Sequence, residues 1–221
     1  HSLTKYIGGH GTSIGGIVVD GGNFDWIKDR KRQPLLNEPD QSYGGAVWAD
    51  AVPQLTGANI PFVIRLRVVL LRDLGAPLSP FNAFQLIQGL ETVGLRMKQH
   101  CSNAEKVVSF LETQKKVTNV IYPTNHQGEI KERAKKYMQG GYGSLVGMDV
   151  GTKENGAKFI DNLKMLYHVA NIGDARSLAI HPATTTHSQL NDKELLAAGV
   201  TPGYVRLSIG IEHPDDIIAD I

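Results

Sequence analysis

Residues 2–11 read Ser-Leu-Thr-Lys-Tyr-Ile-Gly-Gly-His-Gly, which places Lys5 beside hydroxyl side chains and a glycine-rich backbone. Hydroxyl groups and exposed backbone amides are typical ligands of a phosphate. A lysine held next to them can react with an aldehyde, and positive or apolar surroundings would keep its amine nucleophilic. On spacing alone, a surface turn that carries a solvated lysine is the favoured interpretation, because short motifs often match by chance.

The composition predicts a globular protein. The chain has 221 residues, 41% of them hydrophobic and 20% charged, which suits one large or two small domains. Its 23 Lys and Arg nearly balance 22 Asp and Glu, so it lacks the basic excess typical of nucleic-acid binding. The apolar run 61–71 contains two arginines and is too short to span a bilayer. With the single cysteine, Cys101, unable to form an intramolecular disulfide, we expect a cytoplasmic protein without nucleic-acid or membrane partners.

Alternating strand and helix patterns predict an α/β or α+β layered fold. Residues 16–22 predict a short buried strand, and six prolines between residues 23 and 80 predict little regular structure there. Ser79 and Pro80 predict the start of a long helix, whose apolar residues recur every three or four positions as far as Leu111. Beyond it we predict strands at 117–122, 143–150 and 205–211, and helices at 155–168 and 191–198.

The segment around Lys5 resembles the lysine signature of the Cys/Met metabolism enzymes. These enzymes use pyridoxal 5'-phosphate (PLP), a cofactor that carries both a phosphate and an aldehyde. Further segments match in the family's order, at residues 78–86, 95–101, 171–187 and 205–212. The resemblance implies an α/β, fold-type I PLP transferase, in which residues 1–92 complete the large mixed-sheet PLP domain and residues 93–221 form a smaller α/β C-terminal domain. The long helix would cross that boundary.

The resemblance also implies roles for individual residues. Lys5 would bind PLP covalently, and Ser2 and Thr4 would hydrogen-bond its phosphate. Arg206 would bind the substrate's α-carboxylate, for which a planar, permanently charged guanidinium is suited. Without the resemblance, a strand-surface ion pair would explain Arg206 more simply. Asn171 stands where many relatives carry a serine that helps to bind the same carboxylate.

Within the family the chain is most similar to the O-acetylhomoserine sulfhydrylases, because of the long stretch between residues 26 and 80 and the sequence Asn-Ile-Gly-Asp-Ala-Arg-Ser-Leu from residue 171. This similarity implies γ-replacement on O-acetyl-L-homoserine by sulfide or a small thiol, giving L-homocysteine and acetate. Methionine γ-lyase and cystathionine γ-synthase activities stay open. The family also implies a homotetramer, and it implies that an N-terminal half or a companion chain supplies the remaining cofactor contacts. We therefore expect this chain to start within a fold.

Two other hypotheses belong to different classes. Residues 11–15, Gly-Thr-Ser-Ile-Gly, fit the nucleophile elbow of α/β-hydrolases with Ser13 as nucleophile, but that elbow requires a strand before the serine and a helix after it. The chain could instead be a catalytically silent fragment or partner subunit. His181 and His187 lack cysteines or carboxylates at ligand spacing, so we predict no metal site and interpret both as structural or pocket-lining.

Overall fold

The computed structural model describes all residues, 1–221, and the chain divides into two compact units. Unit 1 comprises His1 and residues 15–83, and unit 2 comprises residues 2–14 and 84–221. The Lys5 segment therefore packs with the C-terminal part of the chain, far from it in sequence.

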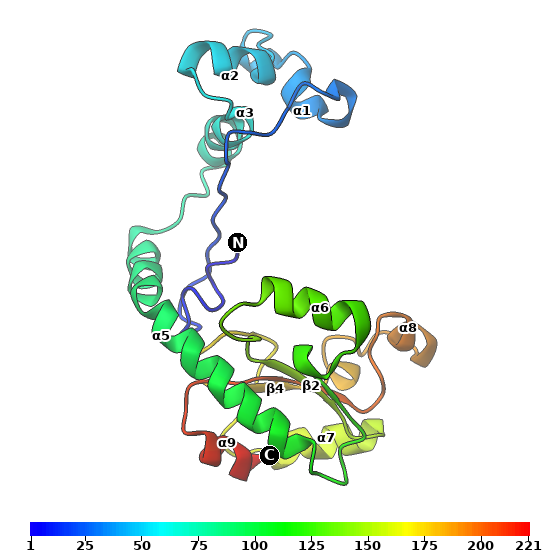
Figure 1. The fold of residues 1–221 in the computed structure, drawn as a ribbon. Helices are drawn as coiled ribbons and strands as arrows, with labels where there is room; N and C mark the ends of the chain where they lie inside the picture. Colours follow the sequence, from blue (N-terminus) through cyan, green and yellow to red (C-terminus); the bar gives the residue numbers. More distant parts are fainter. The chain divides into compact units, whose positions relative to one another are not determined.

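Unit 1 is built from short helices: α1 (Pro34–Asn37), α2 (Trp48–Thr56), α3 (Pro61–Arg65) and α4 (Arg72–Leu74), with π-helical residues Leu66–Leu71 joining the last two (Figure 1). The prediction of little regular structure between residues 23 and 80 was therefore wrong. Pro34 and Pro61 occupy the first turns of α1 and α3, where a missing N–H costs no hydrogen bond. Gly57 and Gly75, both left-handed, end α2 and α4.

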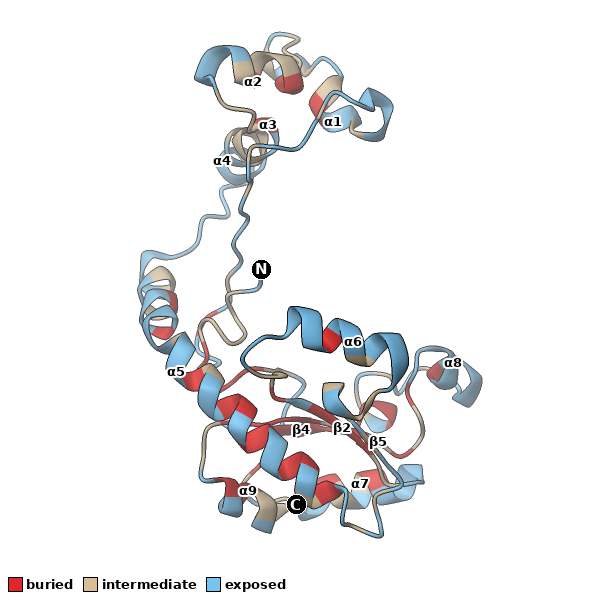
Figure 2. Cartoon of the chain, in the orientation of Figure 1, coloured by how far each residue is buried: buried red, intermediate tan, exposed pale blue.

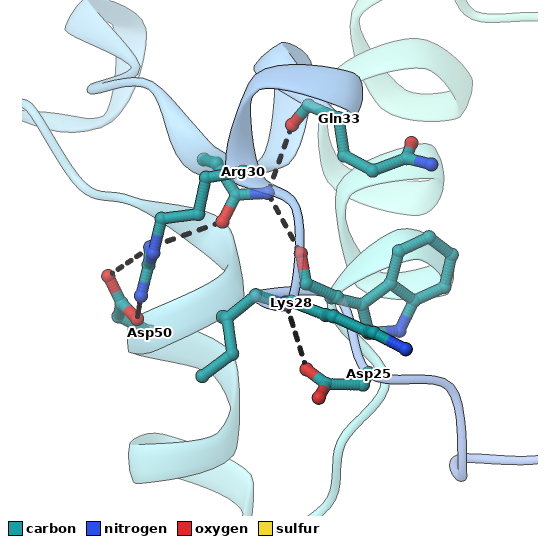
Figure 3. A network of polar contacts seen from close by, with 8 residues as sticks. Asp25, Lys28, Arg30, Gln33 and Asp50 are labelled. Carbon is teal, nitrogen blue, oxygen red and sulfur yellow. Dashed lines mark hydrogen bonds and ion pairs between the residues drawn. The ribbon is translucent and has the colours of Figure 1, made fainter.

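The core of unit 1 is a small cluster of Leu36, Trp48, Ala49 and Val52. The indole N–H of Trp48 donates to Asp40 at 2.9 Å. Arg30 donates to both carboxylate oxygens of Asp50, at 3.0 and 2.7 Å (Figure 3). Because this ion pair is close to half exposed, we expect it to contribute little to stability.

The buried strand predicted at residues 16–22 is absent. Ile17, Val18 and Val19 are 45%, 53% and 76% exposed, and they form no ladder with another strand. An apolar run predicts a buried strand only if neighbouring strands cover it, and this chain places none beside these residues.

Unit 2 contains a five-stranded sheet with the order β1-β2-β5-β4-β3. Only β3 and β4 pair in parallel. The predicted strands at 117–122, 143–150 and 205–211 are confirmed with narrower bounds, whereas the two strands between them were not predicted. The strands are β1 (Asn119–Ile121), β2 (Leu145–Asp149), β3 (Tyr167–His168), β4 (Leu178–Ile180) and β5 (Tyr204–Ser208).

The long helix α5 (Pro80–Leu111) confirms the prediction from residues 80 to 111. The predicted helix at 191–198 is confirmed as α8 (Asp192–Ala197), with a capping box formed by Asn191 and Glu194. The predicted helix at 155–168 was wrong at its end, because α7 (Lys153–Asn162) stops where Asp220 accepts the N–H groups of residues 164–166. Two further helices are α6 (Gly128–Tyr137) and α9 (Pro214–Asp220).

The two faces of the sheet have different surroundings. One face packs against α5, α7 and α9 and forms the main core, in which Val107, Val146, Val205 and Leu207 are fully buried (Figure 2). Side chains alternate along a strand, so Tyr204, Arg206 and Ser208 of β5 point to the other face. Helix α6 lies on that other side of the sheet (Figure 1).

The predicted division at residues 92/93 concerns a complete family member and stays a prediction; α5 crosses that position without interruption. No single helix is long and apolar enough to cross a membrane. Only Trp48–Thr56 and Pro61–Leu74 taken together meet the length and composition required, and they are bent by 101° relative to each other.

Candidate active site

Lys5 lies in a closed backbone turn. The N–H of Gly8 donates to the backbone oxygen of Leu3 at 2.8 Å, and the N–H of Gly9 donates to the backbone oxygen of Lys5 at 2.7 Å. Gly9 has φ 71°, a left-handed conformation that glycine adopts without steric cost. The turn thus holds Lys5 half-buried on a hydrogen-bonded backbone. This differs from the alternative considered for the motif, a surface turn that carries a solvated lysine.

The amine of Lys5 donates to the side-chain oxygen of Asn171 at 2.5 Å. Two residues further along that loop, the N–H of Gly173 donates to Ser208 at the end of β5 at 3.0 Å. The loop that carries Asn171 is therefore attached to the sheet. With its oxygen on Lys5, Asn171 keeps its amide N–H groups free for another acceptor, so its predicted role in carboxylate binding stays a prediction.

Arg206 reaches the same loop from the middle of β5. Its Nη2 donates to the backbone oxygens of Ala170 at 2.7 Å and Asn171 at 3.3 Å. Its Nε is buried without a hydrogen-bond partner. Arg206 forms no ion pair, so the simpler explanation as a strand-surface ion pair was wrong.

A second set of side chains supports the Lys5 turn, and sequence reasoning missed it. The hydroxyl of Tyr6 hydrogen-bonds Ser144 at 2.9 Å, and the centroids of the Tyr6 and His100 rings lie 5.4 Å apart, with the two rings perpendicular at 89°. Burial raises the pKa of Tyr6, so the phenol stays protonated at neutral pH. The available signals were the position of Tyr6 directly after the lysine and the position of His100 in the matching segment 95–101; Ser144 lies in none of the matching segments.

Ser2 and Thr4 lie within three residues of Lys5 in the same turn, Ser2 exposed and Thr4 half-buried. This placement is compatible with phosphate ligands on one loop. Their role stays a prediction.

Ser13 does not form a nucleophile elbow. No strand precedes it, no helix follows it, and its hydroxyl donates to Gln85 at 2.6 Å instead of to a histidine. His181 is fully buried, hydrogen-bonded to Thr184 and to the backbone oxygen of Pro202. This confirms the structural interpretation of His181. His187 contacts Thr186, and no group of three or more His, Cys, Asp and Glu side chains is arranged to hold a metal ion.

The arrangement suits a cofactor aldehyde together with an amino-acid carboxylate. Lys5 and Arg206 meet at one loop residue, Asn171, and neither cation is neutralised by an acidic side chain. An unpartnered buried guanidinium N–H is expensive unless an anion completes its coordination. The site therefore fits PLP bound at Lys5 and a substrate carboxylate at Arg206.

A family model for the Cys/Met metabolism PLP-dependent enzymes matches residues 1–221. The chain belongs to this family.

Several relatives are similar over the whole chain. O-acetyl-L-homoserine sulfhydrylase of Leptospira meyeri is 49% identical over 226 residues, covering 100% of this chain and 51% of that protein. Homocysteine synthase of Schizosaccharomyces pombe is 45% identical over 221 residues, covering 100% of this chain and 50% of that protein. The chain thus spans about half the length of these relatives.

Solved structures match the fold. A Campylobacter jejuni protein assigned as an O-acetylhomoserine (thiol)-lyase, which contains pyridoxyl-lysine monophosphate, has a TM-score of 0.84 and 40% identity, covering 100% of this chain and 51% of that chain. Cystathionine γ-lyase of Lactobacillus plantarum, complexed with L-serine, has a TM-score of 0.74 and 26% identity, covering 100% and 48%. The α/β fold described here matches the C-terminal part of these PLP fold-type I structures.

Proposed function

We propose that this chain forms the lysine- and carboxylate-binding half of a PLP-dependent O-acetyl-L-homoserine sulfhydrylase. The reaction replaces the acetate on Cγ of O-acetyl-L-homoserine with hydrogen sulfide or a small thiol; with sulfide, the products are L-homocysteine and acetic acid. The observation that carries the proposal is the meeting of Lys5 and Arg206 at Asn171. The names of relatives at 43–49% identity support the choice of substrate.

Lys5 has the chemistry of the cofactor-binding and proton-transferring residue. Its amine is hydrogen-bonded to the neutral amide of Asn171 and forms no ion pair with an acidic side chain. Bound PLP supplies an electron sink that acidifies the carbons next to the substrate's amino group. The released Lys5 amine would then move protons between Cα and Cβ of the substrate, with Asn171 holding its position.

Arg206 would orient the substrate. Two backbone carbonyls hold one end of its guanidinium, while the buried Nε keeps a donor for the α-carboxylate. A guanidinium fixed in this way presents a planar set of donors to a carboxylate. The free amide N–H groups of Asn171 would add one more donor beside it.

The other parts of the active enzyme belong to the same proposal. We infer that the half of the family fold outside this chain, in a longer polypeptide or a companion chain, completes the cofactor site. Ser2 and Thr4 would contribute phosphate contacts, and the enzyme would be a cytoplasmic homotetramer. Methionine γ-lyase and cystathionine γ-synthase remain the alternatives within the family.

The test is turnover by the complete enzyme that contains this chain. With PLP, O-acetyl-L-homoserine and sulfide, we expect homocysteine and acetate in equal amounts. Production of 2-oxobutyrate from methionine would favour the lyase, and cystathionine formation from cysteine would favour the synthase. Absence of all three activities in a folded, PLP-loaded preparation would reject the proposal.

A further inference from the structure

The Lys5 turn is contacted by a buried arginine on α5, Arg96, which lies in the segment 95–101 that resembles the family but to which that resemblance assigned no role. Arg96 is 6% exposed. Its Nη1 donates to Tyr6 at 2.8 Å, and its Nη2 donates to Ile7 at 3.2 Å and Gly89 at 2.6 Å, in each case to a backbone oxygen. Its Nε donates to Thr92 at 3.2 Å.

These contacts satisfy a specific need of the backbone. The carbonyls of Tyr6 and Ile7 end a turn, so the turn's own N–H groups do not reach them. Buried carbonyl groups without a partner are costly. The guanidinium of Arg96 bonds both carbonyls at once, Tyr6 through Nη1 and Ile7 through Nη2. Its Nη2 also bonds Gly89 on the same helix. A compact ammonium group cannot reproduce this arrangement.

Two glycines allow this close approach. At position 89 a Cβ would overlap the carbonyl oxygens of Ile7 and Gly8, so only glycine lets the turn lie on α5. At position 9 a Cβ would overlap the guanidinium of Arg96. The Lys5 turn therefore packs directly against α5, with the Arg96 side chain between them.

Arg96 lacks the usual compensation for a buried cation. It forms no ion pair, and burial lowers its pKa. A buried guanidinium without a carboxylate is unfavourable for stability alone, unless its hydrogen bonds fix a backbone that must be fixed. The backbone that it contacts carries Lys5.

We propose that Arg96 is a positioning residue, which holds the Tyr6 and Ile7 carbonyls against α5 and so orients the amine of Lys5 toward Asn171. This inference rests on the proposed function for the importance of Lys5. Arg96 acts through the backbone and touches neither substrate nor cofactor.

The first arm of the test needs no cofactor. Hydrogen exchange of the Gly8 and Gly9 amides is compared in the wild-type chain and in Arg96→Met, with residues 146–148 of β2 as an internal reference. Arg96→Met keeps the aliphatic stem and removes the donors, so we expect about tenfold or faster exchange in the turn with β2 unchanged. The exchange rates of the Gly8 and Gly9 amides in Arg96→Lys should lie between those of the wild type and Arg96→Met. Arg96→Lys serves as the test variant if Arg96→Met does not fold.

The second arm measures Lys5 directly. The same proteins, as the complete enzyme, are incubated with PLP and reduced with borohydride, and the pyridoxyl group on Lys5 is quantified by peptide mapping. We expect labelling of Lys5 to decrease from wild type to Arg96→Lys to Arg96→Met. Arg133→Met, which changes an exposed residue, is the control and should be labelled as strongly as the wild type.

Unchanged exchange at Gly8 and Gly9, or equal acceleration in β2, would overturn the positioning role, as would undiminished labelling in Arg96→Met. A wild-type enzyme that is not labelled at Lys5 would reject the proposed function, and the exchange arm would still decide whether Arg96 holds the turn.

Discussion

The amine of Lys5 and the side-chain oxygen of Asn171 are 2.5 Å apart, although 166 residues separate them in the chain. The loop of Asn171 also supplies both backbone acceptors of Arg206, at Ala170 and Asn171. One loop therefore sets the position of the amine and of the guanidinium. This connection places the two halves of the proposed chemistry, proton transfer and carboxylate binding, beside each other.

Replacement of Asn171 by alanine should affect the chemical step. The Lys5 amine loses its acceptor, and mispositioning of a proton-transferring group costs on the order of 10–100-fold in kcat. Steady-state kinetics of the complete enzyme check this expectation, with Asn155→Ala as control, since the side-chain amide of Asn155 donates to the backbone oxygen of Val150, away from Lys5 in the sequence. A kcat equal to wild type would show that Asn171 does not position the amine.

Loss of the Arg206 guanidinium should weaken substrate binding. If Arg206 binds the substrate carboxylate as proposed, Arg206→Met removes the partner of that carboxylate, which costs about 2–4 kcal/mol, or roughly 30- to 1,000-fold in kcat/KM, mostly through KM. Arg206→Lys should recover only part of the loss, because an ammonium lacks the planar fork. Arg133→Met, which breaks an exposed ion pair with Glu129, is the control. An unchanged KM for the amino acid in Arg206→Met would remove Arg206 from the site.

Two glycines of α5 give opposite predictions for the same substitution. Gly89→Ala forces a methyl group against the Lys5 turn and should destabilise the protein by about 1–3 kcal/mol. Gly94→Ala meets no atom within 4 Å and should stabilise the helix by about 0.5–1 kcal/mol. Urea unfolding of both variants measures the difference. Equal effects would show that α5 and the turn do not approach each other as described.

His100 predicts a loss of stability in mild acid. Burial lowers its pKa and nearby Arg96 adds to the effect, while the carbonyl of Ile209 and the carboxylates of Glu212 and Asp174 oppose it. In the unfolded protein His100 gains a proton at about pH 6.5, whereas in the folded protein it gains the proton only at lower pH. The unfolded state thus binds more protons below that pH, and stability falls there by at most about 1.4 kcal/mol per pH unit.

The His100→Gln variant isolates this contribution. It should reduce the pH dependence of the free energy of unfolding between about pH 7 and pH 5, whereas His168→Gln at an exposed position should not. Identical slopes in wild type and His100→Gln would contradict the prediction.

Local patterns predicted the elements whose periodicity is strong. Helix α5 was visible because its apolar residues recur at helical spacing over 32 residues after Pro80. Helix α6 was missed because Ala134 is its only buried residue, so it has hardly any apolar stripe. The end of α7 was misplaced because a distant side chain, Asp220, captures the N–H groups that would continue the helix. Such tertiary contacts leave no local trace.

Some residues of the candidate site could likewise be predicted from the sequence, and others could not. Lys5 and Arg206 could be proposed from segments that resemble the family, and the structure places both at Asn171. Arg96 and His100 lie in the matching segment 95–101, but neither they nor Ser144 could be given a role, because their contacts depend on groups far away in the sequence. A buried arginine in a helix looks, in sequence, like any exposed one.

Borohydride reduction followed by peptide mapping tests whether Lys5 binds PLP. The complete enzyme is incubated with PLP, reduced, digested and compared with Lys5→Ala. We expect a pyridoxyl group on the peptide that contains Lys5, absent from Lys5→Ala and from the other lysines. A folded enzyme labelled elsewhere, or not labelled at all, would contradict it.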